Sequence, residues 1–229
     1  MQVFYSHNIE GESIALSPTD AAHVSRVLRM KIGDELIVTD GSGKAIRGAI
    51  VEISKEVCII QASAKIDSAP RQERKISIAL ALLKNQDRIE WFIEKGCELG
   101  IHEFLLFTAQ RSERKSINTD RLQKKIIESC KQSHNYNFPK LRIIKNTQDL
   151  INMEYEGEKY IAHCDEMGKA TIRNNSELPK RILIGPEGDF TEEEKNIAIQ
   201  KGYNAVSLGP LRLRSETAAL YALMLLKNI

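Results

Sequence analysis

The sequence has few of the features that mark secreted, membrane-bound or metal-binding proteins. Its 229 residues include four cysteines, which lie far apart at positions 58, 97, 130 and 164 and form no CxxC pair. A disulfide framework or a zinc site is therefore not indicated, and a reduced, cytoplasmic protein is the simplest expectation. No apolar run approaches the roughly 18 residues that span a membrane. The first seven residues lack the basic segment and apolar stretch of a secretory signal, so we expect none.

An excess of positive charge is also missing. The chain has 33 basic and 31 acidic side chains, which gives a formal net charge of +2. Bulk charge does not indicate a nucleic-acid binder, so any RNA-binding surface must come from local clusters. The hydrophobic fraction of 42% is sufficient for ordinary cores and excludes global disorder. The length fits two modest domains or one large one.

The first part of the chain predicts a small β-barrel with one helix. Its strand-like segments are rich in Ile, Val and Ala, and glycines at residues 40–43 suit a hairpin turn. Ser17 and Pro18 suit the cap and the first position of the helix. The apolar side of this helix is expected to hold Ala21, Ala22, Val24, Val27 and Leu28. Strands are expected at residues 13–17, 35–39, 44–53 and 57–62.

The pattern changes after a polar, proline-containing segment at residues 67–75, which indicates a linker. Residues 76–83 form a continuous apolar run, as in a strand buried on both faces of a parallel sheet. Strands then alternate with helices, which predicts an α/β domain with a mainly parallel sheet. Further strands are expected at 104–107, 141–144, 159–163, 181–184 and 205–208, and helices at 87–99, 119–133, 191–201 and 215–227.

Two loops of this domain carry the functional argument, and the first follows the strand that ends at Ile184. Residues 185–190 contain two glycines, which let a ligand approach the backbone closely. Thr191 and Glu194 then have the spacing of a capping box at a helix start. Such turns at the carboxyl ends of parallel strands are where these sheets bind ligands. Taken alone, the loop is better explained as a tight structural turn.

The second loop, residues 209–219, also leads from a Gly-Pro turn into a helix. Ser215 suits the N-cap and Glu216 suits the first turn, so both are explained by capping alone. Arg212 and Arg214 are not, because positive charge is unfavourable at a helix N-terminus. Arg214 is better placed to meet an anion such as a phosphate. Two such loops on successive strands make a specific signal for a ligand site.

Further motifs run in order along the whole chain, at residues 23–34, 84–91, 95–100, 111–115 and 131–133. Together with the Gly-Pro-Glu-Gly loop at 185–188 and the Leu-Arg-Ser-Glu-Thr-Ala stretch at 213–218, they resemble the RsmE-type 16S rRNA uridine-N3 methyltransferases of the SPOUT superfamily. The departures are small. Many relatives carry glycine where Asp189 stands and threonine where Ser215 stands. The pair Leu211-Arg212 also differs from the pair often seen in relatives.

The resemblance implies two domains and a cofactor. Residues 1–70 would form a PUA-like β-barrel that binds RNA, and residues 71–229 a SPOUT methyltransferase domain with an α/β trefoil knot. The cofactor would be S-adenosyl-L-methionine (SAM), and the protein would be a homodimer. By the same resemblance, the SAM pocket would be lined by Leu183, Gly185, Glu187, Gly188, Leu208, Gly209 and Leu213.

The implied reaction places a methyl group on N3 of a specific uridine in 16S rRNA of the small ribosomal subunit. N3 of neutral uracil holds a proton, so the enzyme must remove it or stabilise the anion, and no metal is needed. Arg214 would position a phosphate or stabilise the anion, while Glu216 is a possible base whose rival role is capping. The RNA would meet basic clusters formed by His23, Arg26, Arg29 and Lys31 and by Arg111, Arg114 and Lys115.

Alternatives remain at this stage. The protein could be a non-catalytic RNA-binding ribosome assembly factor, or a SPOUT methyltransferase with another RNA target. A metal-dependent hydrolase built on His163 and Asp165 is a third, although adjacent strand residues point to opposite faces, so packing explains His163, Cys164 and Asp165 better. Trp91 is expected in the core. The apolar last helix, residues 218–226, suits either a dimer interface or the core.

Overall fold

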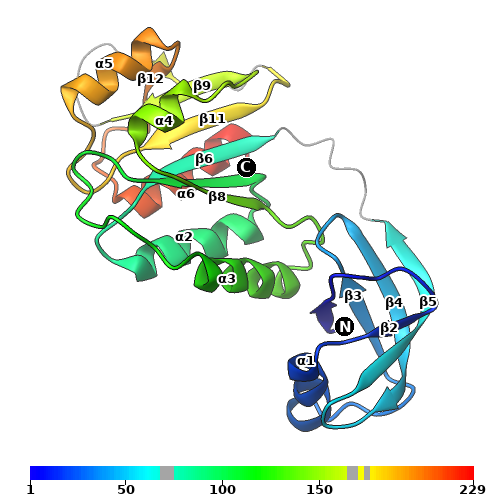
Figure 1. The fold of residues 1–229 in the computed structure, drawn as a ribbon. Helices are drawn as coiled ribbons and strands as arrows, with labels where there is room; N and C mark the ends of the chain where they lie inside the picture. The colour runs from blue at the N-terminus through cyan, green and yellow to red at the C-terminus, as the bar shows by residue number, and fades with distance from the viewer. Residues whose placement is uncertain (68–74, 164–169, 173–175) are drawn as a thin grey trace. The chain divides into compact units, whose positions relative to one another are not determined.

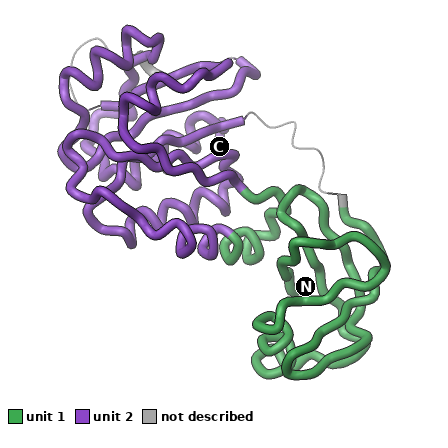
Figure 2. Tube along the Cα trace, in the orientation of Figure 1, with its two compact units in different colours: residues 1–72, 127–138 green, residues 73–126, 139–229 purple. Residues whose placement is uncertain are grey.

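The structure is a computed structural model of the chain, and it describes all residues except 68–74, 164–169 and 173–175. The chain forms two compact units (Figure 2): residues 1–72 with 127–138, and residues 73–126 with 139–229. The predicted division after residue 70 did not place residues 127–138 in the first unit. They belong there through contacts distant in sequence, since Lys131 pairs with Asp20 at 3.4 Å and lies over the Phe4 ring.

The first unit is built on a five-stranded sheet with the order β1-β3-β4-β5-β2. Its strands are β1 (Val3–Tyr5), β2 (Ser13–Ala15), β3 (Glu35–Thr39), β4 (Lys44–Ile53) and β5 (Cys58–Asp67). Side chains such as Phe4, Leu36 and Ile60 form its core. Four of these strands were predicted. The three-residue β1 was missed because only its parallel pairing with β3 makes it a strand.

The helix predicted for the first part of the chain begins as expected. In α1 (Pro18–Ala22), the Ser17 side chain accepts a hydrogen bond from the amide of Asp20, and proline occupies the first turn. The chain then continues as the π-helix η1 (His23–Val27). Val24 is buried, but Val27 is 65% exposed, so its predicted place on the apolar side was wrong. The wider winding of a π-helix changes which side chains face the core.

The second unit is a mixed α/β fold, as predicted, around a seven-stranded parallel sheet with the order β10-β12-β9-β11-β6-β7-β8 (Figure 1). The strands are β6 (Ile76–Ala81), β7 (Glu103–Phe107), β8 (Lys140–Ile144), β9 (Glu158–Ala162), β10 (Ala170–Thr171), β11 (Lys180–Ile184) and β12 (Asn204–Ser207). The helices are α2 (Gln86–Glu98), α3 (Thr119–Gln132), α4 (Thr147–Asn152), α5 (Glu192–Gln200) and α6 (Ser215–Lys227). The short α4 and β10 were not predicted.

The strand order determines where the two informative loops meet. Both β11 and β12 pair with β9, one on each side of it, in parallel. Their carboxyl ends therefore lie at the same edge of the sheet, and the loops that follow them flank the end of β9. Helix α6 leaves the second loop and packs against α2, β6 and β11. Within the described residues, no helix has the length and apolar character needed to cross a bilayer.

Candidate cofactor and RNA site

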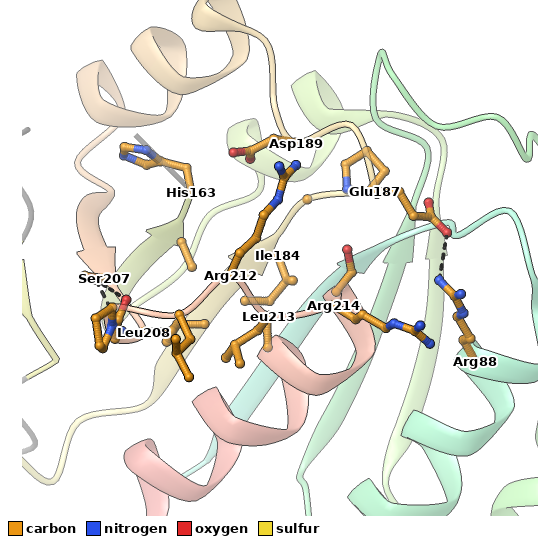
Figure 3. A pocket seen from close by; sticks show the side chains of 18 residues that line it. Arg88, His163, Ile184, Glu187, Asp189, Ser207, Leu208, Arg212, Leu213 and Arg214 are labelled. Carbon is orange, nitrogen blue, oxygen red and sulfur yellow. Dashed lines mark hydrogen bonds and ion pairs between the residues drawn. The ribbon is translucent and has the colours of Figure 1, made fainter. Parts of the chain in front are cut away.

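A cavity of about 990 Å³ lies where the loops after β11 and β12 meet (Figure 3). Loop residues supply most of its wall, together with the end of β9 and one arginine from α2. It is lined by Arg88, Ala162, His163, residues 184–187, Asp189, residues 207–215 and Ala218. The wall combines apolar side chains, glycine backbone and several charged groups, the combination expected of a site for an amphipathic small molecule.

Five of the residues predicted to bind the cofactor line this cavity: Gly185, Glu187, Leu208, Gly209 and Leu213. Leu183 and Gly188 do not line it. The Leu183 side chain is fully buried in a core cluster with Phe190 and Ala198, on the sheet face away from its neighbours Ile182 and Ile184. The Gly188 carbonyl accepts a hydrogen bond from Arg111 at 2.8 Å and so serves the loop's own structure.

The first loop is held by contacts at both ends. The predicted capping box is present, with the Thr191 side chain and Glu194 bonded to each other's backbone. Asp189 adopts a φ of 61° and accepts a hydrogen bond from the Phe190 amide. This left-handed backbone is one that glycine adopts more readily than other residues. Glu187 accepts a hydrogen bond from the Lys84 amide and pairs with Arg88 at 3.7 Å, which ties the loop to α2.

Glu194 connects three segments of the chain through its carboxylate. Its Oε1 accepts hydrogen bonds from Thr147 Oγ1 (2.5 Å) and the Gln110 amide (3.0 Å), and its Oε2 accepts one from the Thr191 amide (2.9 Å). Glu194→Ala removes both acceptor oxygens, and with them these three hydrogen bonds, from a buried position, so we expect it to lower the free energy of unfolding by roughly 2–4 kcal/mol. Thermal or urea unfolding measures this. The exposed Glu193, in the same helical turn, is the control: Glu193→Ala should cost less than about 1 kcal/mol. Equal losses would contradict the account.

The second loop turns at Gly209 and ends at α6. The Gly209 amide donates to Ser207 Oγ at 3.2 Å, and the φ of Gly209 is 120°. The N-cap of α6 is Arg214, without a side-chain capping bond, and Ser215 is the first helical residue. The prediction that Ser215 caps this helix was therefore wrong by one position. The Arg214 side chain makes no capping bond, and it lines the cavity instead.

At Gly209 the backbone conformation disfavours a side chain, although there is room for one. Nothing lies within 4 Å of a Cβ built there, yet its φ of 120° is one that L-residues rarely adopt. Gly209→Ala is expected to destabilise the protein by about 1–3 kcal/mol or to shift the loop and weaken cofactor binding. Calorimetry with and without SAM measures both effects. Gly188→Ala is the matched control, because its Cβ would meet Arg111 at an ordinary 3.4 Å. A Gly209→Ala variant with normal melting and normal SAM affinity would refute the strain argument.

The charges of the site are unevenly paired. Arg88 forms ion pairs with Glu187 and with Glu216, both at 3.7 Å. Arg212 and Arg214 are exposed and line the cavity, and nothing in the described chain pairs with either guanidinium. In Figure 3, Arg212 extends toward the first loop and Arg214 toward Arg88. Two unpaired cations in one wall make the cavity suited to an anionic group.

Glu216 lies in the first turn of α6, at the border of the cavity. It is only 7% exposed, and its Oε2 has no hydrogen-bond partner among the described residues. Its side chain pairs with Arg88 and forms no capping bond, so capping by hydrogen bond, its rival role, does not occur here. The carboxylate still complements the helix dipole.

Lys84, which precedes α2, lies outside the cavity wall. A hydrogen bond with Glu113 raises the pKa of the Lys84 ammonium.

The basic residues predicted to meet RNA fall into two groups with different surroundings. In the first unit, His23, Arg26, Arg29 and Lys31 are all exposed, on η1 and the turn after it. Arg29 adopts a left-handed φ of 53°, and the exposed Val27 and Ile32 lie within the same segment. A strained backbone among exposed cationic and apolar side chains is typical of a contact surface.

In the second unit, the predicted RNA-binding arginines also hold the site together. Arg111 donates to the carbonyl of Gly188, and Arg114 donates to those of Leu83 and Lys84 at 3.1 Å each. Lys115 is exposed. Arg111 and Arg114 therefore hold the loops after β11 and β6 in place, a structural role that was not predicted from the sequence.

Two residues of this region differ from their predicted roles. Trp91 was expected in the core but is 41% exposed, because the buried face of α2 is formed by Ile89, Phe92 and Ile93. His163 lines the cavity, while Cys164 and Asp165 lie outside the described residues. Across the residues that are described, no three His, Cys, Asp or Glu side chains are grouped as metal ligands. Arg88 was missed as a site residue, although its motif was noted.

Comparison with known proteins identifies the same two parts. A family model described as an RNA methyltransferase domain matches residues 70–227, and one described as an RNA methyltransferase PUA domain matches residues 16–62. Among curated relatives, ribosomal RNA small subunit methyltransferase E 2 of Borreliella burgdorferi is 31% identical, over 90% of this chain and 87% of that protein. Ribosomal RNA small subunit methyltransferase E of Bacillus subtilis is 28% identical, over 93% and 89%.

Solved structures agree with this result. Ribosomal RNA small subunit methyltransferase E from Neisseria gonorrhoeae, bound to S-adenosyl methionine, has a TM-score of 0.88 and 25% identity, covering 100% of this chain and 97% of that one. A probable rRNA-methyltransferase from Porphyromonas gingivalis has a TM-score of 0.91 and 34% identity, covering 100% and 99%. The chain therefore belongs to the ribosomal RNA small subunit methyltransferase E family, with an RNA methyltransferase domain and a PUA domain.

Proposed function

We propose that this protein transfers a methyl group from SAM to N3 of a specific uridine in 16S rRNA of the small ribosomal subunit. The observation that carries the proposal is the cavity at the ends of β9, β11 and β12, whose wall holds Arg212 and Arg214, two cations without a partner among the described residues. The relatives named as small-subunit rRNA methyltransferases support the substrate. The SAM-bound relative supports the cofactor.

The residues of the cavity fit SAM. Ile184, Leu208 and Leu213 offer apolar surface for an adenine, and the glycine turns at 185 and 209 leave backbone groups accessible for hydrogen bonds. When bound, SAM supplies an electrophilic methyl group on a sulfonium. We also propose that the loops at 185–190 and 208–214 belong to a trefoil knot. Their positions on both sides of β9 support this.

The chain's own residues would prepare the uracil. The N3–H bond breaks as its proton passes to a base, for which Glu216 is our candidate. N3 then bonds to the methyl carbon while the sulfur–carbon electron pair returns to sulfur, leaving a neutral thioether. Arg214 would hold the adjoining phosphate or stabilise the uracil anion, because its guanidinium lines the cavity and has no partner in the part of the chain that the structure describes.

The RNA would be held by the two parts of the chain separately. We assign residues 1–70 to RNA binding through His23, Arg26, Arg29 and Lys31, which are all exposed. Residues 71–229 would hold the active site, with Lys115 and the free edges of Arg111 and Arg114 contacting phosphates. Because 16S rRNA of the small subunit is the proposed substrate, we place the protein in the cytoplasm.

We further propose that the protein is a homodimer. One side of α6 is core, since Ala219, Ala222 and Leu223 are buried against the sheet and α2. The other side carries Tyr221, which is 41% exposed and suits a contact with a second copy. Light scattering should give twice the chain mass of 25.9 kDa.

The proposed function is tested with ribosomal subunits from cells that lack this gene. Small and large subunits are incubated separately with the protein and SAM labelled on the methyl group. We expect label in the rRNA of small subunits alone. Label in large subunits would move the target to another RNA. SAM binding without transfer to either subunit would contradict the substrate, and neither binding nor transfer would leave a non-catalytic assembly factor.

A further inference from the structure

A second, smaller pocket adjoins the cavity on the side of α2. It has a volume of about 290 Å³ and is lined by Asp87, Arg88, Trp91, Arg214, Glu216 and Thr217. Arg88 and Arg214 belong to the walls of both spaces, so the two are direct neighbours. Figure 3 shows these two guanidinium groups extending toward each other along that shared wall. A group held in the small pocket would therefore lie beside the ligand of the large one.

Trp91, which lines this pocket, is unusually exposed for a tryptophan. It is the only tryptophan in the chain, and it is 41% exposed among charged neighbours, whereas Phe92 beside it is fully buried. Core packing therefore does not account for so large an aromatic side chain at this position. The exposed face of an indole is a surface on which an unpaired nucleobase stacks, and such stacking is how proteins hold extruded bases.

Glu216 gives the pocket a directional polar group. Its carboxylate is more than nine-tenths buried and lines the pocket, one oxygen pairs with Arg88, and Oε2 has no hydrogen-bond partner among the described residues. A buried acceptor without a donor is costly, so a ligand that donates to it is favoured. The guanidinium groups of Arg88 and Arg214 can only donate. The pocket thus presents one acceptor together with two donor groups.

This pattern matches one edge of one nucleobase. The imide edge of uracil carries a carbonyl, the N3–H and a second carbonyl, which read as acceptor, donor and acceptor. Cytosine has an acceptor at N3 in place of this donor, so in the same orientation it would leave the Glu216 oxygen unsatisfied. We infer that this pocket docks the target uracil, stacked on Trp91 with its imide edge toward Glu216 and the two arginines. The inference rests on the proposed function and assigns its base-binding site.

The test compares Trp91→Ala with Trp91→Phe, using small subunits from cells that lack the gene. We expect Trp91→Ala to lower kcat/KM for methyl transfer by about 5- to 150-fold, the range that base–aromatic stacking spans. Trp91→Phe keeps an aromatic face and should recover activity to within about threefold of the wild type. The Kd for SAM, measured by equilibrium dialysis, should stay unchanged in both variants. Leu178→Ala, which removes another exposed apolar side chain from the same unit, should leave kcat/KM unchanged.

Several results would overturn the inference while leaving the proposed function intact. Normal kcat/KM in Trp91→Ala, or an equal loss in Trp91→Phe, would remove base stacking. An equal loss of SAM affinity in Trp91→Ala would assign Trp91 to the cofactor site. Conversion of a dimer to a monomer by Trp91→Ala, seen by light scattering, would make this face a protein interface. A wild-type protein that methylates no subunit would instead refute the proposed function itself.

Discussion

Replacement of Arg214 by alanine is expected to lower kcat/KM for methyl transfer by about 10²–10³-fold, the loss typical when one group that stabilises a developing charge is removed. The guanidinium lies at the N-cap of α6, lines both pockets and has no ion pair in the described part of the chain. Its charge is therefore available to a phosphate or to the uracil anion. Methyl transfer to small subunits at limiting RNA measures the effect.

Arg212 provides the matched control for Arg214. It is two residues away, also exposed, without a partner among the described residues and part of the large cavity, but it does not line the pocket beside Trp91. Arg212→Ala should reduce kcat/KM by about tenfold or less, since surface charges act mainly on binding. The Kd for SAM should change less than fivefold in Arg214→Ala. If both variants lost SAM binding to the same extent, the two arginines would serve the cofactor and not the RNA.

Glu216→Gln is expected to lower kcat by about 10²–10⁴-fold, the contribution usual for a positioned general base. Glutamine keeps the size of the side chain but cannot take the N3 proton. Glu216 lines the small pocket, its Oε1 pairs with Arg88, and its buried Oε2 has no hydrogen-bond partner in the described chain. Single-turnover kinetics with saturating SAM and RNA isolate this step from binding.

Glu187→Gln is the control for Glu216→Gln, because it also removes an ion pair with Arg88 but leaves the candidate base in place. Glu187 also pairs with Arg88 at 3.7 Å, but it lines the cofactor cavity and holds the Lys84 amide. We expect Glu187→Gln to weaken SAM binding while the single-turnover rate at saturation stays within about tenfold of the wild type. Equal single-turnover rates in Glu216→Gln and the wild type would show that Glu216 serves only the helix dipole.

Much of the fold could be predicted from local patterns. Continuous apolar runs such as Ile76 to Ala81 and the cap signals at Thr191 and Ser17 depend on neighbours in sequence, and the structure confirms them. The elements that were missed depend on distant partners. The three residues of β1 are a strand only beside β3, and residues 127–138 join the first unit only through contacts such as Lys131 with Asp20.

The site was predicted less completely, for the same reason. The resemblance named Gly185, Gly209 and Arg214, and all three line the cavity. It could not show that Leu183 points into the core, because that depends on which strand face is covered by α5. Arg88 was within a noted motif, but its role appears only when α2 places it between Glu187 and Glu216.

The most direct test of the central claim is a chemical identification of the product. Small subunits from cells lacking the gene are incubated with the protein and SAM, and the 16S rRNA is digested to nucleosides and fragments for mass spectrometry. We predict that 3-methyluridine appears at a single position and is absent after incubation with Arg214→Ala. A methyl group on any other atom or base, or no new methyl group despite bound SAM, would contradict the account.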